Sequence, residues 1–475
     1  MRKLGGIKIG LVLLLISSLF LATGCTKGGS SSAISAYKSV TLEYWSVWND
    51  ESDIKPLINA YRSLHPNVSI KYNKYRFDEY ENKLLEAMAE DRGPDVFSIH
   101  NTWVKKYQSR LTPSPASVSL PVKYMTGTVK KEEVVEFRAT KLLNANDVEK
   151  TFLDVVAGDV VLYQNIGDEK TPNFVKKVYG LPLSVDTLVL YYNRDLLNNA
   201  GIITPPETWT EFSEQVKKIT KIDKDTGEII LSGAAIGAAD NVLRSFDILS
   251  LLMMQNLAPM VDSRGRAAFD KTPNQYPDIK IPPALGALDF YVQFASPLYE
   301  GYSWNSEMPN SLDAFIKGQT AFFFGYSYNR EEIASKAPKM NFKIAPVPQV
   351  GDDQKVNYAN YWVETVSNKT EQEAYAWDFI KFITDEKNVE AYLDQTNKPT
   401  ALRSTKLINK QLADPEMEAF ADQLLTAKSW YKGYNATAAE EAFKEMINGV
   451  LDGTFISELA IKNAVSKVNR SILYK

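Results

Sequence analysis

The chain has 475 residues, with 54 lysines and arginines against 58 aspartates and glutamates and a formal net charge of −4. This acidic balance argues against nucleic acid as a partner, because phosphate backbones attract basic surfaces. The single cysteine excludes an intrachain disulfide, so the fold must depend on apolar burial, for which a chain of this length is sufficient.

The first segment has the pattern of a secretory signal. A basic start precedes an apolar run from residue 9 to 22, which is short for a membrane span. The residues Leu21-Ala22-Thr23-Gly24-Cys25 resemble a bacterial lipobox. The resemblance implies a signal peptide over 1–24, fatty acyl chains such as palmitate on Cys25, and retention on the cell membrane, facing the periplasm or the exterior. An ordinary signal peptide with an unrelated cysteine is the alternative.

Residues 25–37 are rich in glycine and serine and predict a flexible tether that reaches on the order of 20 to 35 Å. After the tether, strand and helix patterns alternate. Apolar residues recur every second position over 40–44 and 68–72, and at helical spacing over 54–61 and 80–88. A short apolar run over 95–99 completes a predicted β-α-β-α-β order.

Such an alternation calls for a parallel sheet, and ligands of such sheets gather beyond the carboxyl ends of the strands. The loops after Tyr44 and after Ile99 are therefore candidate ligand-binding loops. They contribute seven aromatic or polar candidates: Trp45, Trp48, Asn49, Asp50, His100, Asn101 and Trp103.

The pattern weakens over residues 111–150, which we interpret as an insertion on the lobe. Order resumes with a predicted strand over 187–192. A helix is then predicted to begin at the capping box Thr208-Trp209-Thr210-Glu211. Residues 240–300 are predicted to be mostly helical with a proline-rich interruption, and the region from 372 onward is predicted to be nearly all helix.

Several motifs stand in a fixed order along the chain: LEYWSVWND, GPDVFSIHNTW, YGLPLSVDTLVLYYNRDLLNNAGI, PPETWTEF, FIKGQTA, APVPQVGD, AYAWDFIKFITDEKN and GTFISELAIKNAVSKVN. Together they resemble the extracellular solute-binding proteins of ABC importers, in the branch that includes maltose- and oligosaccharide-binding proteins. The resemblance covers nearly the whole chain after the tether, and the segments 111–150 and 255–285 depart from it.

The resemblance implies a two-lobed α/β fold of the type II periplasmic-binding-protein kind, with hinge-linked lobes and a helical C-terminal region. The first lobe is expected over 38–184 and 323–384, and the second over 185–322 and 385–475. A carbohydrate is expected in the cleft between the lobes, where hinge closure buries it for delivery to a membrane permease. A monomer is compatible with such a cleft, and no cofactor is expected.

A carbohydrate site needs flat aromatic rings for the C–H faces of sugars and polar side chains for their hydroxyls. The family supplies candidates in the second half of the chain. Trp430-Tyr431 matches a stacking pair of the maltose-binding branch, Tyr326 and Tyr328 follow the family's strand and glycine, and Trp362 stands where relatives place a cleft aromatic. Core packing of Trp430 and half-buried strand alternation of the two tyrosines are the alternatives.

Two carboxylates complete the candidate ligand-binding residues. Glu364 follows Trp362 by two positions and would point the same way on a strand. Asp186 lies where the chain is expected to cross between the lobes.

The competing interpretations keep the fold and change the ligand to a polyamine, a peptide or another small solute, or make the chain a lipid-anchored glycosidase with paired carboxylates. A Ser-His-Asp or Cys-His site is nearly excluded, because only His65 and His100 exist and the single cysteine belongs to the lipobox. No H-E-x-x-H motif or glycine-rich phosphate loop occurs, so we expect no metal and no nucleotide.

Overall fold

The structure is a computed structural model that describes residues 31–168, 170–351 and 354–473. The chain divides into a small compact unit, which contains the residues up to Lys38 together with Pro121–Arg138, and a large one, which contains Ser39–Leu120 and the chain from Ala139 onward. The predicted signal peptide and Cys25 lie outside the described residues. Of the predicted tether, the structure describes residues from 31 on, and there the prediction of a flexible segment is wrong, because Ser31–Ala36 form a helix, α1, with Ala33 buried.

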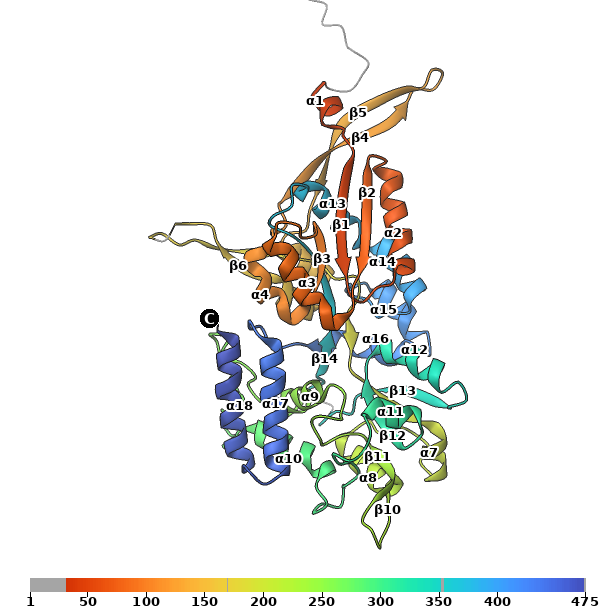
Figure 1. Ribbon diagram of the computed structural model, residues 1–475, viewed down its shortest axis with the longest axis vertical. Coiled ribbons are helices and arrows are strands. Elements are labelled where there is room, and N and C mark those ends of the chain that lie inside the picture. The colour runs from red at the N-terminus through yellow and green to blue at the C-terminus, as the bar shows by residue number, and fades with distance from the viewer. Residues whose placement is uncertain (1–30, 169, 352–353, 474–475) are drawn as a thin grey trace, which may run out of the picture. The chain divides into compact units, whose positions relative to one another are not determined.

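The large unit contains two cores, and the first surrounds a four-stranded sheet of order β15-β3-β1-β2. Strand β1 pairs in parallel with β2 and β3, while β15 runs antiparallel to β3. Helices cover the sheet in the order predicted, so the β-α-β-α-β prediction is confirmed (Figure 1). The elements are β1 (Val40–Ser46), α2 (Glu51–Leu64), β2 (Val68–Lys74), α3 (Phe77–Ala89), β3 (Val96–His100), β15 (Trp362–Val366) and α13 (Glu373–Ile383). We call this part the first lobe.

The second core surrounds a five-stranded mixed sheet of order β10-β11-β12-β9-β13. Its strands are β9 (Val189–Asn193), β10 (Lys221–Ile222), β11 (Ile229–Ala234), β12 (Thr320–Gly325) and β13 (Phe342–Pro346). Successive residues of a strand point to opposite faces of a sheet. Accordingly Phe322 and Phe324 of β12 join the large core, whereas Phe323 joins a smaller cluster. We call this part the second lobe.

Helices on both faces complete the second lobe. The predicted helix after Thr208 is confirmed, because Thr208 and Glu211 form the expected capping box. The helices α17 and α18 pack against each other, as Figure 1 shows. The helices are α7 (Arg194–Asn199), α8 (Trp209–Ile219), α9 (Ser245–Gln255), α10 (Pro283–Val292), α11 (Ser311–Ile316), α12 (Ser327–Lys336), α17 (Ala436–Leu451) and α18 (Ser457–Ile472), with the 3-10 turn η3 (Gln293–Ala295).

A three-stranded sheet of order β16-β14-β8 lies where the chain passes between the two cores. Its strands are β8 (Asp186–Thr187), β14 (Asn357–Asn360) and β16 (Ala427–Lys428). The chain leaves the first core after Val185 and enters the second at Leu188. It returns at Ala359 and leaves again after Ala427.

Two of the expected crossings therefore differ from the structure. The chain was expected to return near Phe323, but β12 and β13 both pair with β9 in the second lobe. It was expected to leave near Thr384, but α14 (Glu386–Thr396) packs on α2 and buries Val389 and Leu393 in the first core. The physical reason is that an amphipathic pattern shows which face of an element is buried without showing which core receives it.

Most of the remaining elements lie around the first core, but α16 (Glu418–Gln423) also packs on β13 and places Phe420 in the smaller cluster with Phe323. The remaining elements are η1 (Asn101–Trp103), α4 (Val104–Tyr107), η2 (Gln108–Arg110), α5 (Ala145–Thr151), α6 (Asp154–Val160), α15 (Thr405–Leu412), α16 and η4 (Leu424–Thr426). The predicted insertion over 111–150 contains a hairpin of β4 (Ser117–Thr126) and β5 (Glu132–Lys141). A second hairpin joins β6 (Val161–Asn165) to β7 (Phe174–Val178). Within the part of the chain that the structure describes, no helix has both the length and the apolar character that a bilayer span requires.

Candidate ligand-binding site

A narrow pocket lies between the two lobes, beside the three-stranded crossing sheet. It receives residues from the loop after β1, from the crossing segments, from the start of α12 and from β15 with the segment after α14. Its lining consists of Trp48, Asn49, Leu183, Ser184, Asp186, Ser327, Tyr328, Asn360, Tyr361, Trp362, Glu364, Tyr392, Lys398 and Pro399. The pocket thus collects side chains from both lobes, and its lining runs from Trp48 to Pro399 in the sequence.

The lobes are in contact across this pocket. Trp48 of the first lobe meets Tyr328 of the second edge to face, with the ring centroids 4.8 Å apart. The enclosed volume is about 40 Å³, far below the roughly 300 Å³ or more that is usual for a small-molecule site. A wider cavity of about 660 Å³ adjoins it and shares Trp48, Ser327, Tyr328 and Lys398. A ligand with the size of a sugar therefore needs the two lobes to separate before it reaches the narrow pocket.

Asp186 anchors the second lobe to the crossing sheet. Its Oδ2 accepts hydrogen bonds from the Ser327 backbone N–H at 2.9 Å and from Ser327 Oγ at 2.6 Å, and its Oδ1 accepts one from the Thr187 N–H at 2.9 Å. Burial raises the pKa of this carboxyl to about 7, although these hydrogen bonds oppose the shift. Asp186 is thus a polar group held in place in the lining of the pocket.

Glu364 and Lys398 supply the other charges of the floor. Glu364 is 2% exposed, accepts a hydrogen bond from Ser98 Oγ at 2.7 Å, and has a pKa that burial raises to about 7. Lys398 Nζ donates to Asn49 Oδ1 at 2.6 Å and to the Tyr392 hydroxyl at 3.1 Å. An ammonium has three N–H bonds, so one remains for a ligand. The floor therefore combines one fixed cation with two carboxyls whose charge depends on pH.

Trp362 is the aromatic residue of the pocket that the neighbouring rings hold most firmly. His100 and Trp103 meet its ring edge to face at 5.7 Å, and Phe77 and Tyr80 do so at 6.2 Å. His100 is fixed in turn, with Nε2 3.1 Å from Asn360 Oδ1 and Nδ1 2.8 Å from Thr102 Oγ1. Burial, assisted by the charge of Arg244, lowers the pKa of His100 to about 4. The imidazole is therefore neutral near pH 7.

The structure brings together six of the candidate residues in the narrow pocket: Trp48, Asn49, Asp186, Tyr328, Trp362 and Glu364. Asp50 lines the adjoining cavity and pairs with Lys74 at 2.6 Å. His100 and Trp103 stand behind Trp362 and are not among the lining residues. We regard them as residues that position the Trp362 ring.

Three other candidates, Trp45, Asn101 and Tyr326, support the pocket from outside its lining. The Trp45 ring packs on Tyr75 at 4.6 Å. Asn101 is 4% exposed and donates to Asp159. Tyr326 is fully buried in the second core and stacks on Tyr328 at 5.8 Å, so it supports the pocket from behind. Strand and helix geometry explains these cases, because neighbouring residues of an element point in different directions.

The expected stacking pair is not in the pocket. Trp430 is 4% exposed and Tyr431 is 2% exposed, and both belong to the second core. The Trp430 ring is enclosed by aromatic neighbours, and its Nε1 donates to Ser250 Oγ at 3.0 Å. The assignment of these two residues to the ligand is therefore corrected to a role in packing, since their faces are already covered by protein.

Sequence reasoning missed Lys398, Asn360 and Tyr392. Lys398 stands directly before Pro399, and this position was the available signal. Asn360 and Tyr392 gave no signal, because one ends a short strand and the other repeats at helical spacing with buried residues. Among the described residues no group of three histidine, cysteine or acidic side chains is arranged to hold a metal ion.

Comparison with known proteins agrees with this geometry. Over 239 residues the chain is 26% identical to the maltodextrin-binding protein MdxE of Bacillus subtilis, a match that covers 47% of this chain and half of MdxE. It is 21% identical over 395 residues to the galactooligosaccharide-binding protein of the same organism, which covers 82% of this chain and 78% of that protein.

Among solved structures, the sugar-binding protein MalE of Xanthomonas citri superposes with a TM-score of 0.66 at 19% identity, covering 91% of this chain and 97% of that one. This likeness bears on the fold, and it confirms the predicted two-lobed α/β architecture. The family model of the bacterial extracellular solute-binding proteins matches residues 46–390. The resemblance seen in the sequence motifs is thereby confirmed, and the chain belongs to the bacterial extracellular solute-binding protein family.

Proposed function

We propose that this chain captures a carbohydrate between its lobes and delivers it to the permease of an ABC importer. The observation that carries the proposal is the pocket itself, in which the rings of Trp48, Trp362 and Tyr328 stand around Asp186 and Asn360. Aromatic faces suit the C–H surfaces of a sugar ring, and the polar groups suit its hydroxyls. The names of the relatives, which bind maltodextrin and galactooligosaccharide, support the same class of ligand.

Capture would proceed by closure of the lobes. In an open form, Trp48 and Tyr328 separate and the adjoining cavity of about 660 Å³ admits the ligand. On closure the ligand gains contacts with both lobes at once, and this differential affinity shifts the equilibrium toward the closed form. Lys398 and Asn49 from the first lobe and Asp186 from the crossing sheet then hold the hydroxyls. The permease distinguishes the closed form from the open one.

We further propose that acylated Cys25 anchors the protein to the outer face of the cell membrane. The lipobox-like sequence and the extracellular character of the family support this placement. The anchor keeps the binding lobes close to the permease, and the chain acts as a monomer. The role is binding without turnover, so the ligand leaves chemically unchanged.

A thermal-shift screen followed by calorimetry tests the function. The purified protein is screened against neutral oligosaccharides, polyamines, amino acids and short peptides, since a ligand that binds the native state raises the unfolding midpoint. We expect a rise with one class of sugar and recovery of that sugar intact. Trp362→Ala should weaken its binding by about 1 to 3 kcal/mol, whereas the control Tyr163→Ala, on an exposed hairpin, should leave it unchanged.

Three results would count against the proposal. A midpoint shift only with polyamines or peptides would keep the binding role and reject the carbohydrate. Release of a hydrolysed product from a glycan would make the chain an enzyme. Equal affinity in wild type and Trp362→Ala would remove the pocket from the binding role.

A further inference from the structure

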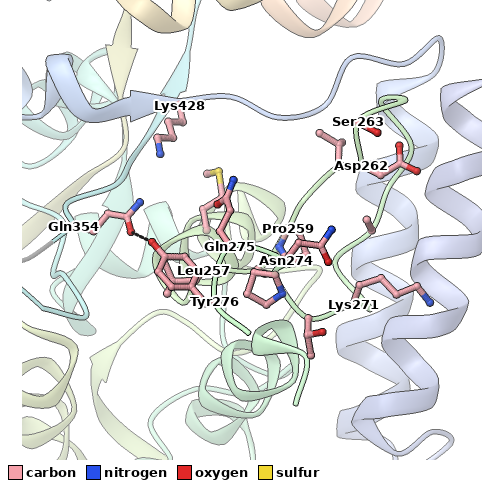
Figure 2. A pocket seen from close by; sticks show the side chains of 16 residues that line it. Leu257, Pro259, Asp262, Ser263, Lys271, Asn274, Gln275, Tyr276, Gln354 and Lys428 are labelled. Atoms are coloured by element: carbon pink, nitrogen blue, oxygen red, sulfur yellow. Dashed lines mark hydrogen bonds between the residues drawn. The ribbon is translucent and has the colours of Figure 1, made fainter. Parts of the chain in front are cut away.

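A separate cavity, of about 700 Å³, lies in the second lobe and shares no lining residue with the two cavities between the lobes. Its walls come from the segment that follows α9, from Gln354 and from Lys428 on β16. Figure 2 shows Lys428 on the strand at one side and Gln354, Tyr276 and Gln275 across from it. The volume falls in the range of roughly 300 to 1,000 Å³ that is usual for small-molecule sites.

The backbone at the floor of this cavity is strained. Leu257 has a φ of 68°, in the left-handed region that residues with a side chain seldom occupy. The surrounding structure holds it there, because its N–H bonds to Met254 O and the next N–H, of Ala258, bonds to Met253 O. A left-handed residue held by such hydrogen bonds is a common way for a helix to end. Here it turns the chain out of α9, and Leu257, Ala258 and Pro259 then supply apolar lining to the cavity.

The charge of the lining is positive. Its one carboxylate, Asp262, is neutralised within its own turn by Arg266 at 3.0 Å and by backbone N–H groups. Lys271 pairs with Asp270 at 2.8 Å. Lys428 is exposed and has no ion-pair partner among the described residues, although the chain as a whole is acidic. The cavity therefore presents one cation whose charge is not compensated by a neighbouring carboxylate.

Neutral hydrogen-bonding groups line the same cavity. The carboxamides of Asn274 and Gln275 make no hydrogen bond to the described part of the chain, and the Tyr276 hydroxyl makes a long one of 3.4 Å to Gln354 Oε1. Carboxamides both donate and accept, which matches the hydroxyl groups of a sugar, and the apolar floor matches its C–H face.

We propose that this cavity is a second ligand site and that it binds an acidic sugar, with the anionic group at Lys428 and the hydroxyls at Asn274 and Gln275. The shared chemistry is a sugar bearing a carboxylate or a phosphate. Because Lys428 lies on β16, which pairs with β14 in the crossing sheet, the occupant contacts both the second lobe and the segment on which the lobes turn. Because the cavities share no residue, both sites can be filled in the same molecule.

Calorimetric titration of the full chain with D-glucuronate and with D-glucose 6-phosphate tests the site, and D-glucose is the neutral reference. We expect at least one of the two acidic sugars to bind at one molecule per chain, at least tenfold more tightly than glucose, and more weakly as salt screens the charge. Lys428→Ala should weaken binding at least tenfold, and so should Gln275→Glu, which places a carboxylate beside the anion. Lys224→Ala, an exposed lysine in a distant turn, should change affinity less than twofold.

The same titrations in the Trp362→Ala chain separate this site from the one between the lobes. If the Trp362→Ala chain still binds the acidic sugar, the result supports a ligand site in the separate cavity, even if no carbohydrate binds between the lobes. The proposal is overturned if neither acidic sugar binds better than glucose, if Lys428→Ala and Gln275→Glu bind like wild type, or if Trp362→Ala abolishes the binding. Comparison of the two acidic sugars decides between a carboxylate and a phosphate.

Discussion

Replacement of Trp430 tests whether this tryptophan belongs to the core or to the ligand. Its ring is 4% exposed, lies 5.7 Å from the ring of Phe246 and 5.8 Å from that of Phe443, and donates to Ser250. Truncation of a buried aromatic residue costs about 3 to 5 kcal/mol, so Trp430→Ala should unfold at a much lower urea concentration. Trp430→Phe keeps most of the ring but leaves Ser250 Oγ without its donor, which costs about 1 to 2 kcal/mol.

Trp377→Phe is the matched control for this prediction. Trp377 is 1% exposed in the first core, and its Nε1 has no hydrogen-bond partner among the described residues. The phenylalanine there loses no hydrogen bond and should destabilise less than Trp430→Phe. Urea unfolding followed by circular dichroism gives the stability, and calorimetry with the ligand found in the screen gives the affinity. The core assignment fails if Trp430→Phe keeps the wild-type unfolding midpoint and binds the ligand more than tenfold more weakly.

Three further predictions follow from particular contacts. Burial raises the pKa of Glu364 to about 7, so between about pH 4 and 7 the native state holds a proton that the unfolded chain has lost. The unfolding free energy that this carboxyl contributes therefore falls as pH rises through that window. Glu364→Gln should flatten the pH dependence of the unfolding free energy relative to wild type, and an unchanged profile would contradict this prediction. A Cβ at Gly180 would lie 2.6 Å from Glu364 O, so Gly180→Ala should lower the unfolding free energy by about 1 to 3 kcal/mol and shift the pocket floor, while Gly351→Ala, which meets nothing within 4 Å, should be neutral in the same urea titration. Cys25→Ala should leave the precursor uncut or release it from the membrane, as cell fractionation and metabolic labelling with a fatty acid would show, and continued retention of a correctly cut chain speaks against acylation.

Local signals in the sequence were sufficient for the order of the elements over residues 40–99 and for the start of α8. Alternation over 40–44 and helical spacing over 54–61 predicted β1 and α2, because each pattern leaves one apolar face that must be buried. The capping box at Thr208 and Glu211 marked the start of α8 within a residue, since both partners of the hydrogen bonds lie within one turn. Of the two predicted loops, the one after β1 contributes Trp48 and Asn49 to the pocket lining, whereas His100 and Trp103 from the one after β3 stand behind Trp362.

Long-range packing decided the rest. Helix α14 repeats apolar residues as any amphipathic helix does, and only its contact with α2 assigns it to the first lobe. Trp430 and Trp362 look alike in a sequence, yet one is enclosed by phenylalanines and the other stands at the edge of the pocket. Lys398 was missed because its partners, Asn49 and Tyr392, are joined to it only in the folded chain.

By itself, then, the sequence determined what depends on neighbours along the chain: the α/β class, the secretory pattern, the succession of strands and helices at the start, and the family, which its ordered motifs reveal. The tertiary structure alone decided which residues meet between the lobes, because Trp48, Asp186, Tyr328, Trp362 and Lys398 come from five separate segments. These residues meet only because two cores and a crossing sheet pack against one another, and the periodicity of a single segment does not contain that information.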